Sequence, residues 1–280
     1  MKSIVSKLTV SVLALGIVAA CSTSPTGRSQ LNLLSSSQLN QMGADSWNEI
    51  RQQEALLQDA EADRYIQCIT DALVEVLPEE YQIDSWEVEI FDSEMVNAFA
   101  LPGGYIGMYV GMMRLADNQH QLAAVMGHEI GHVMAEHSNE RVSQNLLVTA
   151  GLLGADFAFA DRSPQQRSLI MAGLGIGAQV GYMLPYSRRH ESEADEIGME
   201  LMADAGFDPK EAPKLWQNMQ ALGSGGTPEM LSTHPSPGSR IDALNEQLPS
   251  VMPAYEARLA ERAAPTCKAP EWAHKEKPEA

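Results

Sequence analysis

The stretch His-Glu-Ile-Gly-His at residues 128–132 lies within a predicted helix over residues 118–140. Side chains four residues apart lie one turn apart on the same face of a helix, so His128 and His132 can reach one ion. Imidazole nitrogens bind Zn²⁺ at ~2.0–2.1 Å, and Glu129 can accept the proton of a water that the metal activates. The stretch therefore predicts one Zn²⁺ per chain, with a glutamate placed to act as a base.

A catalytic zinc site needs a third protein ligand and keeps one position for water. One class of site adds a glycine and a third histidine downstream, but those positions hold Ala135 and Ser138, so that class is excluded. His137 is one residue away from that spacing and would lie about a hundred degrees around the helix. We therefore expect His137 to be exposed.

Two carboxylates four residues apart occur much later, in Glu191-Ser192-Glu193-Ala194-Asp195. On a helix Glu191 and Asp195 share one face, so one can bind the metal while the other holds a ligand histidine through its second ring nitrogen. Glu193 would point away from that face. The alternative is an acidic helix start that only complements the helix dipole.

Three short strands are predicted before the motif: residues 85–91, the run Asn97-Ala98-Phe99-Ala100-Leu101, and residues 105–110. Helical spacing is present at residues 35–58, 61–77, 195–205, 210–222 and 239–248. The pattern favours an α+β fold, mainly helical, with a small mixed β-sheet.

The first twenty residues indicate a secretory signal rather than part of the fold. Lys2 and Lys7 precede a short apolar run, and small residues lead into Cys21. The segment resembles a bacterial lipobox, whose cysteine is lipidated and becomes the mature N-terminus; an ordinary signal or a membrane anchor is the alternative. Ser22 does not match an inner-membrane retention signal, so we expect a lipid anchor in the outer membrane, facing the periplasm of a Gram-negative bacterium.

The composition suggests four parts: a signal at 1–20, a polar tether at 21–34, a domain at 35–250 and a tail at 251–280. Pro, Lys and Glu dominate from residue 263 onward, and we expect disorder there except around the last cysteine.

Cys68 and Cys267 remain once the lipobox cysteine is set aside. They can form a disulfide in an oxidising periplasm, and the alternative is two free thiols. The chain also carries a net charge of −18, which argues against nucleic acid as a partner.

Residues 146–183 contain long runs of Leu, Ala, Gly and Met, broken by Asp156, Asp161, Arg162 and Pro164. Each run is shorter than the ~20 residues that span a bilayer. We favour a buried helical hairpin. The alternatives are a mobile lid or a hairpin that touches the membrane beside the active site.

Three elements occur in a recognisable order: residues 128–132, then Ser187-Arg188-Arg189-His190-Glu191-Ser192-Glu193-Ala194-Asp195, then Ser232-Thr233-His234-Pro235. Together, and over about residues 27–248, they resemble metallopeptidase family 48, gluzincin zinc peptidases that include the HtpX-type, Oma-type and CAAX-prenyl proteases. The chain is similar to the periplasmic lipoprotein branch. The sequence does not show the four membrane spans of the HtpX-type and prenyl-protease branches, so prenylated substrates are not expected.

The resemblance implies that Glu191 is the third zinc ligand and that Asp195 lies behind the ligands or donates a proton. It also implies that residues 97–100 form an exposed edge strand against which substrate lies extended. For His234 three roles stay open: a zinc ligand that replaces water and keeps the enzyme latent, a transition-state hydrogen-bond donor, or a turn residue. Arg240 either steadies the oxyanion or braces the acidic ligands.

The expected function is a zinc metalloendopeptidase that hydrolyses misfolded or misassembled envelope and outer-membrane proteins. The alternative is a latent or non-proteolytic chaperone, an assembly factor for outer-membrane proteins that uses the same groove.

Overall fold

The computed structural model describes residues 21–83, 85–179, 183–222, 230, 234 and 237–274; the predicted signal at 1–20 lies outside them. The helices are α2 (Ser36–Gln53), α3 (Ala60–Glu75), α4 (Val110–Leu115), α5 (Gln119–Met134), α6 (His137–Ala158), α7 (Pro164–Ala178), α8 (Leu184–Ala205), α9 (Ala212–Leu222) and α11 (Pro237–Glu261). Short 3₁₀ turns are η1 (Glu79–Tyr81), η3 (Pro209–Glu211) and η4 (Glu271–His274).

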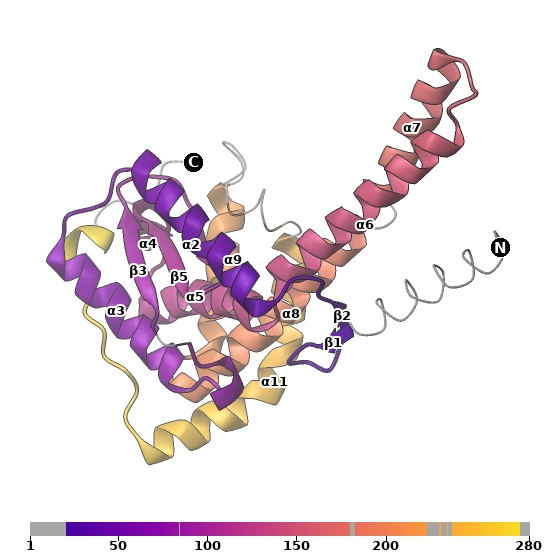
Figure 1. Cartoon of the computed structure of the whole chain (residues 1–280). Helices are drawn as coiled ribbons and strands as arrows, with labels where there is room; N and C mark the ends of the chain where they lie inside the picture. Colours follow the sequence, from indigo (N-terminus) through magenta and orange to yellow (C-terminus); the bar gives the residue numbers. More distant parts are fainter. Residues whose placement is uncertain are drawn as a thin grey trace.

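The N-terminal half of the domain contains a three-stranded mixed sheet (Figure 1). Its order is β3 (Glu87–Phe91), β5 (Tyr105–Tyr109), β4 (Ala98–Leu101), with β3 parallel and β4 antiparallel to the central β5. This arrangement confirms the predicted α+β fold, mainly helical with a small mixed sheet. Among the described residues β4 pairs on one side only, so it is an edge strand.

The two faces of the sheet bury different side chains, as the alternation along its strands dictates. On one face Trp47 of α2 packs against the aromatic rings of Phe91 and Phe99. On the other face Ile90 and Ile106 join the main core with α3 and α5. The sheet is therefore fixed against α5, which carries residues 128–132.

Glycines allow α5 and α8 to approach closely. A Cβ on Gly198 would lie 2.8 Å from the backbone nitrogen of His128, and one on Gly131 would lie 3.0 Å from the carbonyl oxygen of Ala194. Helix α8 begins eleven residues before the predicted start at 195, so Glu191 lies inside the helix, which removes the alternative of an acidic helix start.

The predicted helix over residues 118–140 is broken at its C-terminal end. Helix α5 ends at Met134, Glu136 adopts the left-handed conformation with φ of 47°, and α6 begins at His137. The break changes the rotational phase of every later residue, and the expectation for His137 depended on that phase.

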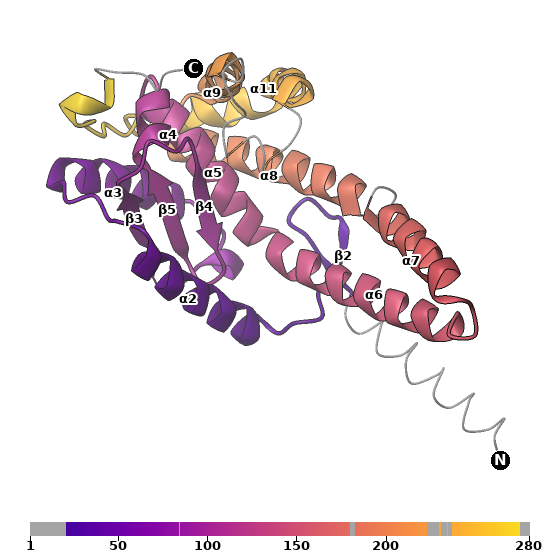
Figure 2. The same cartoon turned by 90° about the horizontal axis from the view of Figure 1, so that it is seen from above.

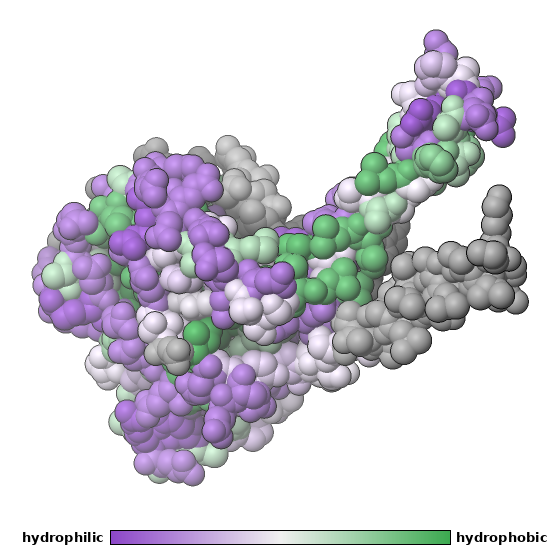
Figure 3. Space-filling model, viewed as in Figure 1, coloured by the Kyte–Doolittle hydropathy of each residue, from purple (hydrophilic) through white to green (hydrophobic). Residues whose placement is uncertain are grey.

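Helices α6 and α7 form a hairpin that projects away from the sheet (Figures 1 and 2). Helix α7 has no buried residue, so the prediction of a buried hairpin is wrong. Figure 3 shows hydrophobic surface along this hairpin and hydrophilic residues at its tip. None of the helices in the described part of the chain combines the length and apolar character that a membrane crossing requires.

The segment predicted to be a tether is packed against the domain. Strands β1 (Cys21–Thr23) and β2 (Ser29–Leu31) form an antiparallel hairpin. The buried Gln30 donates its amide to the carbonyl oxygen of Ala135, and Arg28 forms ion pairs with acidic residues of α6 and α8. These buried polar partners fix the segment, so the flexible tether that its composition suggested is not what the structure shows.

The C-terminal segment is also fixed, contrary to the disorder expected from residue 263. A disulfide joins Cys68 of α3 to Cys267. Beyond it the indole of Trp272 donates to Asp59 Oδ2 at 2.8 Å, and Ala273 is fully buried. The side chains of Trp272 and Ala273 therefore fix a segment whose average composition is polar.

We predict that Gly198→Ala destabilises the protein by about 1–3 kcal/mol, because the added methyl group forces α8 away from α5. Gly151→Ala, in the exposed part of α6, is the matched control. Among the described residues, nothing outside the local helix backbone lies within 4 Å of the position of its new Cβ, so it should be neutral or stabilise the protein by up to ~1 kcal/mol. Urea unfolding of both variants measures the difference; equal stability would contradict the close-packing argument.

Candidate active site

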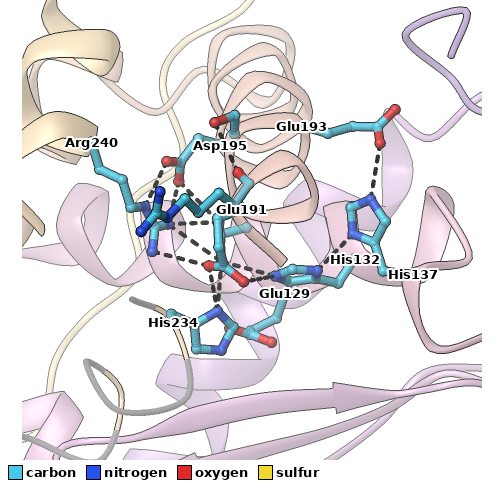
Figure 4. Close-up of polar contacts among 11 residues, drawn as sticks. Glu129, His132, His137, Glu191, Glu193, Asp195, His234 and Arg240 are labelled. Carbon is cyan, nitrogen blue, oxygen red and sulfur yellow. Dashed lines mark hydrogen bonds and ion pairs between the residues drawn. The ribbon is translucent and has the colours of Figure 1, made fainter. Parts of the chain in front are cut away.

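Four side chains from three parts of the chain meet at one point. His128 and His132 come from α5, Glu191 from α8, and His234 from the segment before α11; each offers a ligand atom, and these atoms lie within 4.8 Å of one another. The Nε2 atoms of His128 and His132 are 3.1 Å apart, and each lies 3.5–3.6 Å from an oxygen of Glu191. Figure 4 shows His132, Glu191 and His234 converging.

These separations fit a tetrahedral metal ion. Ligand atoms at 2.0–2.1 Å from zinc are ~3.3 Å apart along the edges of the tetrahedron. In addition, Glu191 Oε1 is buried and makes no hydrogen bond among the described residues, which is costly unless a cation pairs with it. The donor set and the buried oxygen both suit Zn²⁺.

The carboxylate of Asp195 lies behind the ring of His128. Its Nδ1 lies 3.0 Å from Asp195 Oδ1, which leaves Nε2 to face the site. Arg240 in turn donates through Nε to Asp195 Oδ2 at 2.7 Å and through Nη1 to Glu191 Oε2 at 3.1 Å. Its guanidinium is also stacked 3.5 Å above the ring of Trp216. The contacts of Arg240 are those of a residue that braces the acidic ligands rather than of an oxyanion donor.

His132 is oriented by a second chain of hydrogen bonds that the sequence reasoning missed. Its Nδ1 lies 2.7 Å from His137 Nδ1, and His137 Nε2 lies 3.0 Å from Glu193 Oε2 (Figure 4). Burial lowers the pKa of His137 to about 4, so the ring is neutral and can donate to Glu193 while accepting from His132. This order of protons leaves His132 Nε2 free for the metal.

The expectation that His137 is exposed is therefore wrong, because it is only 2% exposed. The chain turns at Glu136, and this turn brings His137 back behind His132. Glu193 does point away from the metal ligands, as predicted, but it is buried against His137. The sequence offered two signals for this contact. His137 follows the motif by five residues, and Glu193 is the middle acid of the later motif.

The β1–β2 hairpin completes this second chain of hydrogen bonds through Arg28. Arg28 donates through Nε to Glu193 at 2.9 Å and through Nη2 to Glu140 at 2.8 Å, while Glu140 also accepts from His190. The pKa of both carboxyl groups is lowered despite burial, because the histidine and arginine hydrogen bonds favour the charged forms. Two buried carboxylates are thus paired by one arginine from outside the main domain.

Glu129 has the environment of a buried base. It is 3% exposed, and burial raises the pKa of its carboxyl group, although the nearby histidines oppose the shift. The backbone of Ala100 in β4 hydrogen-bonds to this carboxylate. The free edge of β4 therefore lies directly beside the base.

The metal-facing side chains differ in their charge states. Burial disfavours a charged His128, yet its hydrogen bonds to Asp195 and Glu191 raise its pKa to about 9. Burial and the charge of His128 lower the pKa of His132. Burial opposes a charged Glu191, but the surrounding histidines hold its pKa well below the usual range. A carboxylate and a neutral histidine are thus ready as ligands before any metal binds.

The described part of the third motif is His234 alone, because Ser232, Thr233 and Pro235 lie outside the described residues. His234 Nδ1 lies 2.7 Å from Glu191 Oε2 and 3.2 Å from His128 Nε2. Its Nε2 lies 3.6 Å from Glu129. His234 is therefore within reach of both the metal ligands and the base.

Such an arrangement belongs to metallopeptidases in which the third ligand is a glutamate from a separate helix. The sequence comparison agrees: the model of Peptidase family M48 matches residues 60–248. The chain belongs to this family of metallopeptidases, as its motifs predicted.

Two kinds of relatives stand out. Identity to the mitochondrial metalloendopeptidase OMA1 of Bos taurus is 32% over 247 residues, covering 82% of this chain and 46% of the relative. Identity to the beta-barrel assembly-enhancing protease of Escherichia coli K12 is 29% over 265 residues, covering 91% and 54%. The chain thus spans about half the length of these curated relatives.

We predict that Glu193→Gln weakens zinc binding by ~10-fold or more, because the loss of its charge frees the His137 ring that orients His132. Glu140→Gln is the matched control: it is also buried and paired with Arg28, but it bonds to His190 rather than to His137, the histidine that contacts His132. Chelator competition measures affinity, and thermal unfolding of the metal-free proteins corrects for stability. Equal losses of affinity would show that the chain through His137 does not position the ligand.

Proposed function

We propose that this chain is a zinc-dependent metalloendopeptidase. The observation that carries the proposal is the tetrahedral spacing of ligand atoms from His128, His132 and Glu191, with the buried Glu129 beside them. When bound, zinc would polarise the scissile carbonyl and lower the pKa of a water molecule. Residues of the chain supply the rest of the chemistry.

Glu129 takes a proton from the attacking water and returns it to the departing amine. Burial supports both steps, because a raised pKa makes the carboxyl group a better proton acceptor and then a usable donor at neutral pH. The hydrogen bond from the Ala100 backbone also holds the carboxylate in place.

The edge of β4 is the proposed substrate platform, through residues Asn97, Ala98, Phe99 and Ala100. The backbone oxygen of Asn97 accepts from Tyr109 of β5, and alternation along the strand leaves the backbone polar groups of Ala98 and Ala100 on the side away from β5. An extended peptide can add there as a further strand, recognised by backbone rather than by side chains. A cavity of about 270 Å³ beside His132 would receive one of its side chains.

The proposed location is the periplasmic face of the outer membrane, with Cys21 carrying the lipid. The lipobox-like start and the Cys68–Cys267 disulfide, which suits an oxidising compartment, support this placement. Misfolded or misassembled outer-membrane proteins are the proposed substrates, in keeping with the name of the Escherichia coli relative.

Glu129→Gln should lower cleavage of an unfolded protein such as casein by ~10²–10⁴-fold, because the base is lost while the ligands stay. Zinc content, measured by plasma mass spectrometry, should remain one per chain. If instead the variant fully complements a deletion strain, the protein acts as a chaperone or assembly factor rather than as a peptidase.

For His234 we propose the latent role, in which it ligates zinc in place of water. Its Nδ1 is as close to His128 Nε2 as the two metal-facing histidines are to each other, within 0.1 Å. His234 belongs to neither α8 nor α11, so its release from the site would not require either helix to shift.

His234→Ala should therefore raise kcat/KM; if about a tenth of the molecules are open, the increase is ~10-fold. Self-cleavage should increase in parallel, as gel electrophoresis would show. A fall in kcat with KM unchanged would instead assign His234 to the transition state.

A further inference from the structure

The α6–α7 hairpin presents apolar side chains to solvent in two stripes. On α6, Leu146, Leu153 and Phe157 follow a spacing of seven and four residues, which places them on one face; Phe157 is 84% exposed. On α7, Leu169 and Ile176 are seven residues apart, and Leu169 is 75% exposed. Large apolar side chains that are exposed together on one hairpin mark a site of interaction.

Charges along the hairpin are arranged to leave this surface neutral. Asp156 on α6 is paired with Arg167 on α7 by a bidentate contact. No other Asp, Glu, Lys or Arg occurs in residues 146–160 or 168–179. The remaining charges, Asp161 and Arg162, lie at the tip.

We propose that this hairpin docks on a lipid surface. The apolar runs at 146–160 and 168–179 are ~22 Å and ~18 Å long as helices, less than the ~30 Å hydrocarbon core. A charged tip would also be costly inside that core. The hairpin therefore lies along the interface, with its leucine and phenylalanine side chains among the acyl chains and its tip in the headgroup region.

The position of the N-terminal segment argues for lipid over other occupants. After β2, Leu33 and Leu34 bond through their backbone to Ser143 and Asn139 of α6, so the segment that starts at Cys21 runs along the base of the hairpin. The anchor proposed above therefore enters the membrane next to the apolar stripes. The inference rests on that anchor for its location, but the hairpin contact itself can be tested without it.

A lipid on Cys21 would hold the chain at the membrane, but orienting the domain there needs a second contact. The hairpin would supply it. Both ends of the hairpin also join the helices of the site, since α6 starts five residues after His132 and α8 starts seven residues before Glu191. The lipid contact would thus hold the active site close to the membrane surface.

The test uses residues 21–280 with Cys21→Ser, which cannot be lipidated, and vesicles of zwitterionic phosphatidylcholine. The hairpin variant combines Leu153→Glu, Phe157→Glu and Leu169→Glu, all at exposed positions. The control combines Asn145→Glu, Ser168→Glu and Gln179→Glu, which adds the same charge to exposed polar positions about a quarter of a turn away from the two apolar stripes. Flotation measures vesicle binding, and light scattering measures the oligomeric state.

The parent and the control should float with the vesicles, and the hairpin variant should bind ~10-fold less or worse. All three should cleave a soluble peptide equally, which separates this inference from the proposed activity: loss of cleavage in all three would count against the peptidase alone. Failure of the parent to float, or equal flotation of the hairpin variant, overturns the inference. A dimer that the hairpin variant abolishes, without flotation, assigns the surface to a second copy of the chain instead.

Discussion

The close contact between α5 and α8 is the constraint on which the site depends. Glycines at 127, 131 and 198 let the two backbones approach to a distance that a methyl group would prevent. Side chains of histidine and glutamate are short, so His128, His132 and Glu191 can share one ion only at this separation. The site is therefore a product of tertiary packing, and metal binding should reinforce the same contact that creates it.

Each metal-facing histidine is fixed from a different side of the molecule. His128 bonds to Asp195, which Arg240 of α11 holds; His132 bonds to His137, whose chain of partners ends at Arg28. A buried carboxylate is costly unless it is paired, and each of these chains ends in an arginine. Arg28 precedes the region matched by the family model, so the N-terminal hairpin contributes to the site although the matched region does not include it.

The sequence predicted what local patterns determine. Period-two alternation located β3, short extended runs on either side of a turn located β4 and β5, and the spacing of four residues paired His128 with His132 and Glu191 with Asp195. The prediction failed where a single residue interrupted the helical period. The left-handed conformation of Glu136 ends α5 and reverses the inference for His137. A helical period carries no information across such a break, because the phase of the next helix depends on how it packs.

Predictions based on composition, such as the buried hairpin and the flexible segments, failed for a different physical reason. Apolar content in residues 146–183 indicates that a surface avoids water, but it does not say what covers that surface. In the same way, a polar average at residues 21–34 and 263–274 concealed the few residues, Arg28, Gln30 and Trp272, that fix each segment. Single buried contacts determine whether such segments are ordered, and a composition averaged over many residues does not show these contacts.

The placement of the hairpin bears on how a peptidase of this design could be selective. If a peptide adds to the edge of β4 as proposed, its backbone is what is recognised and many sequences are accepted, while the cavity beside His132 would offer limited discrimination. Glu191 lies seven residues into α8, so the metal position is ~10 Å along the helix from the base of the hairpin. A peptide of a few extended residues spans that distance. With the hairpin on a lipid surface as proposed, the site would meet extended chains that leave the membrane and would miss folded proteins in bulk solution. Selectivity would then come from where the site is held rather than from which side chains it reads.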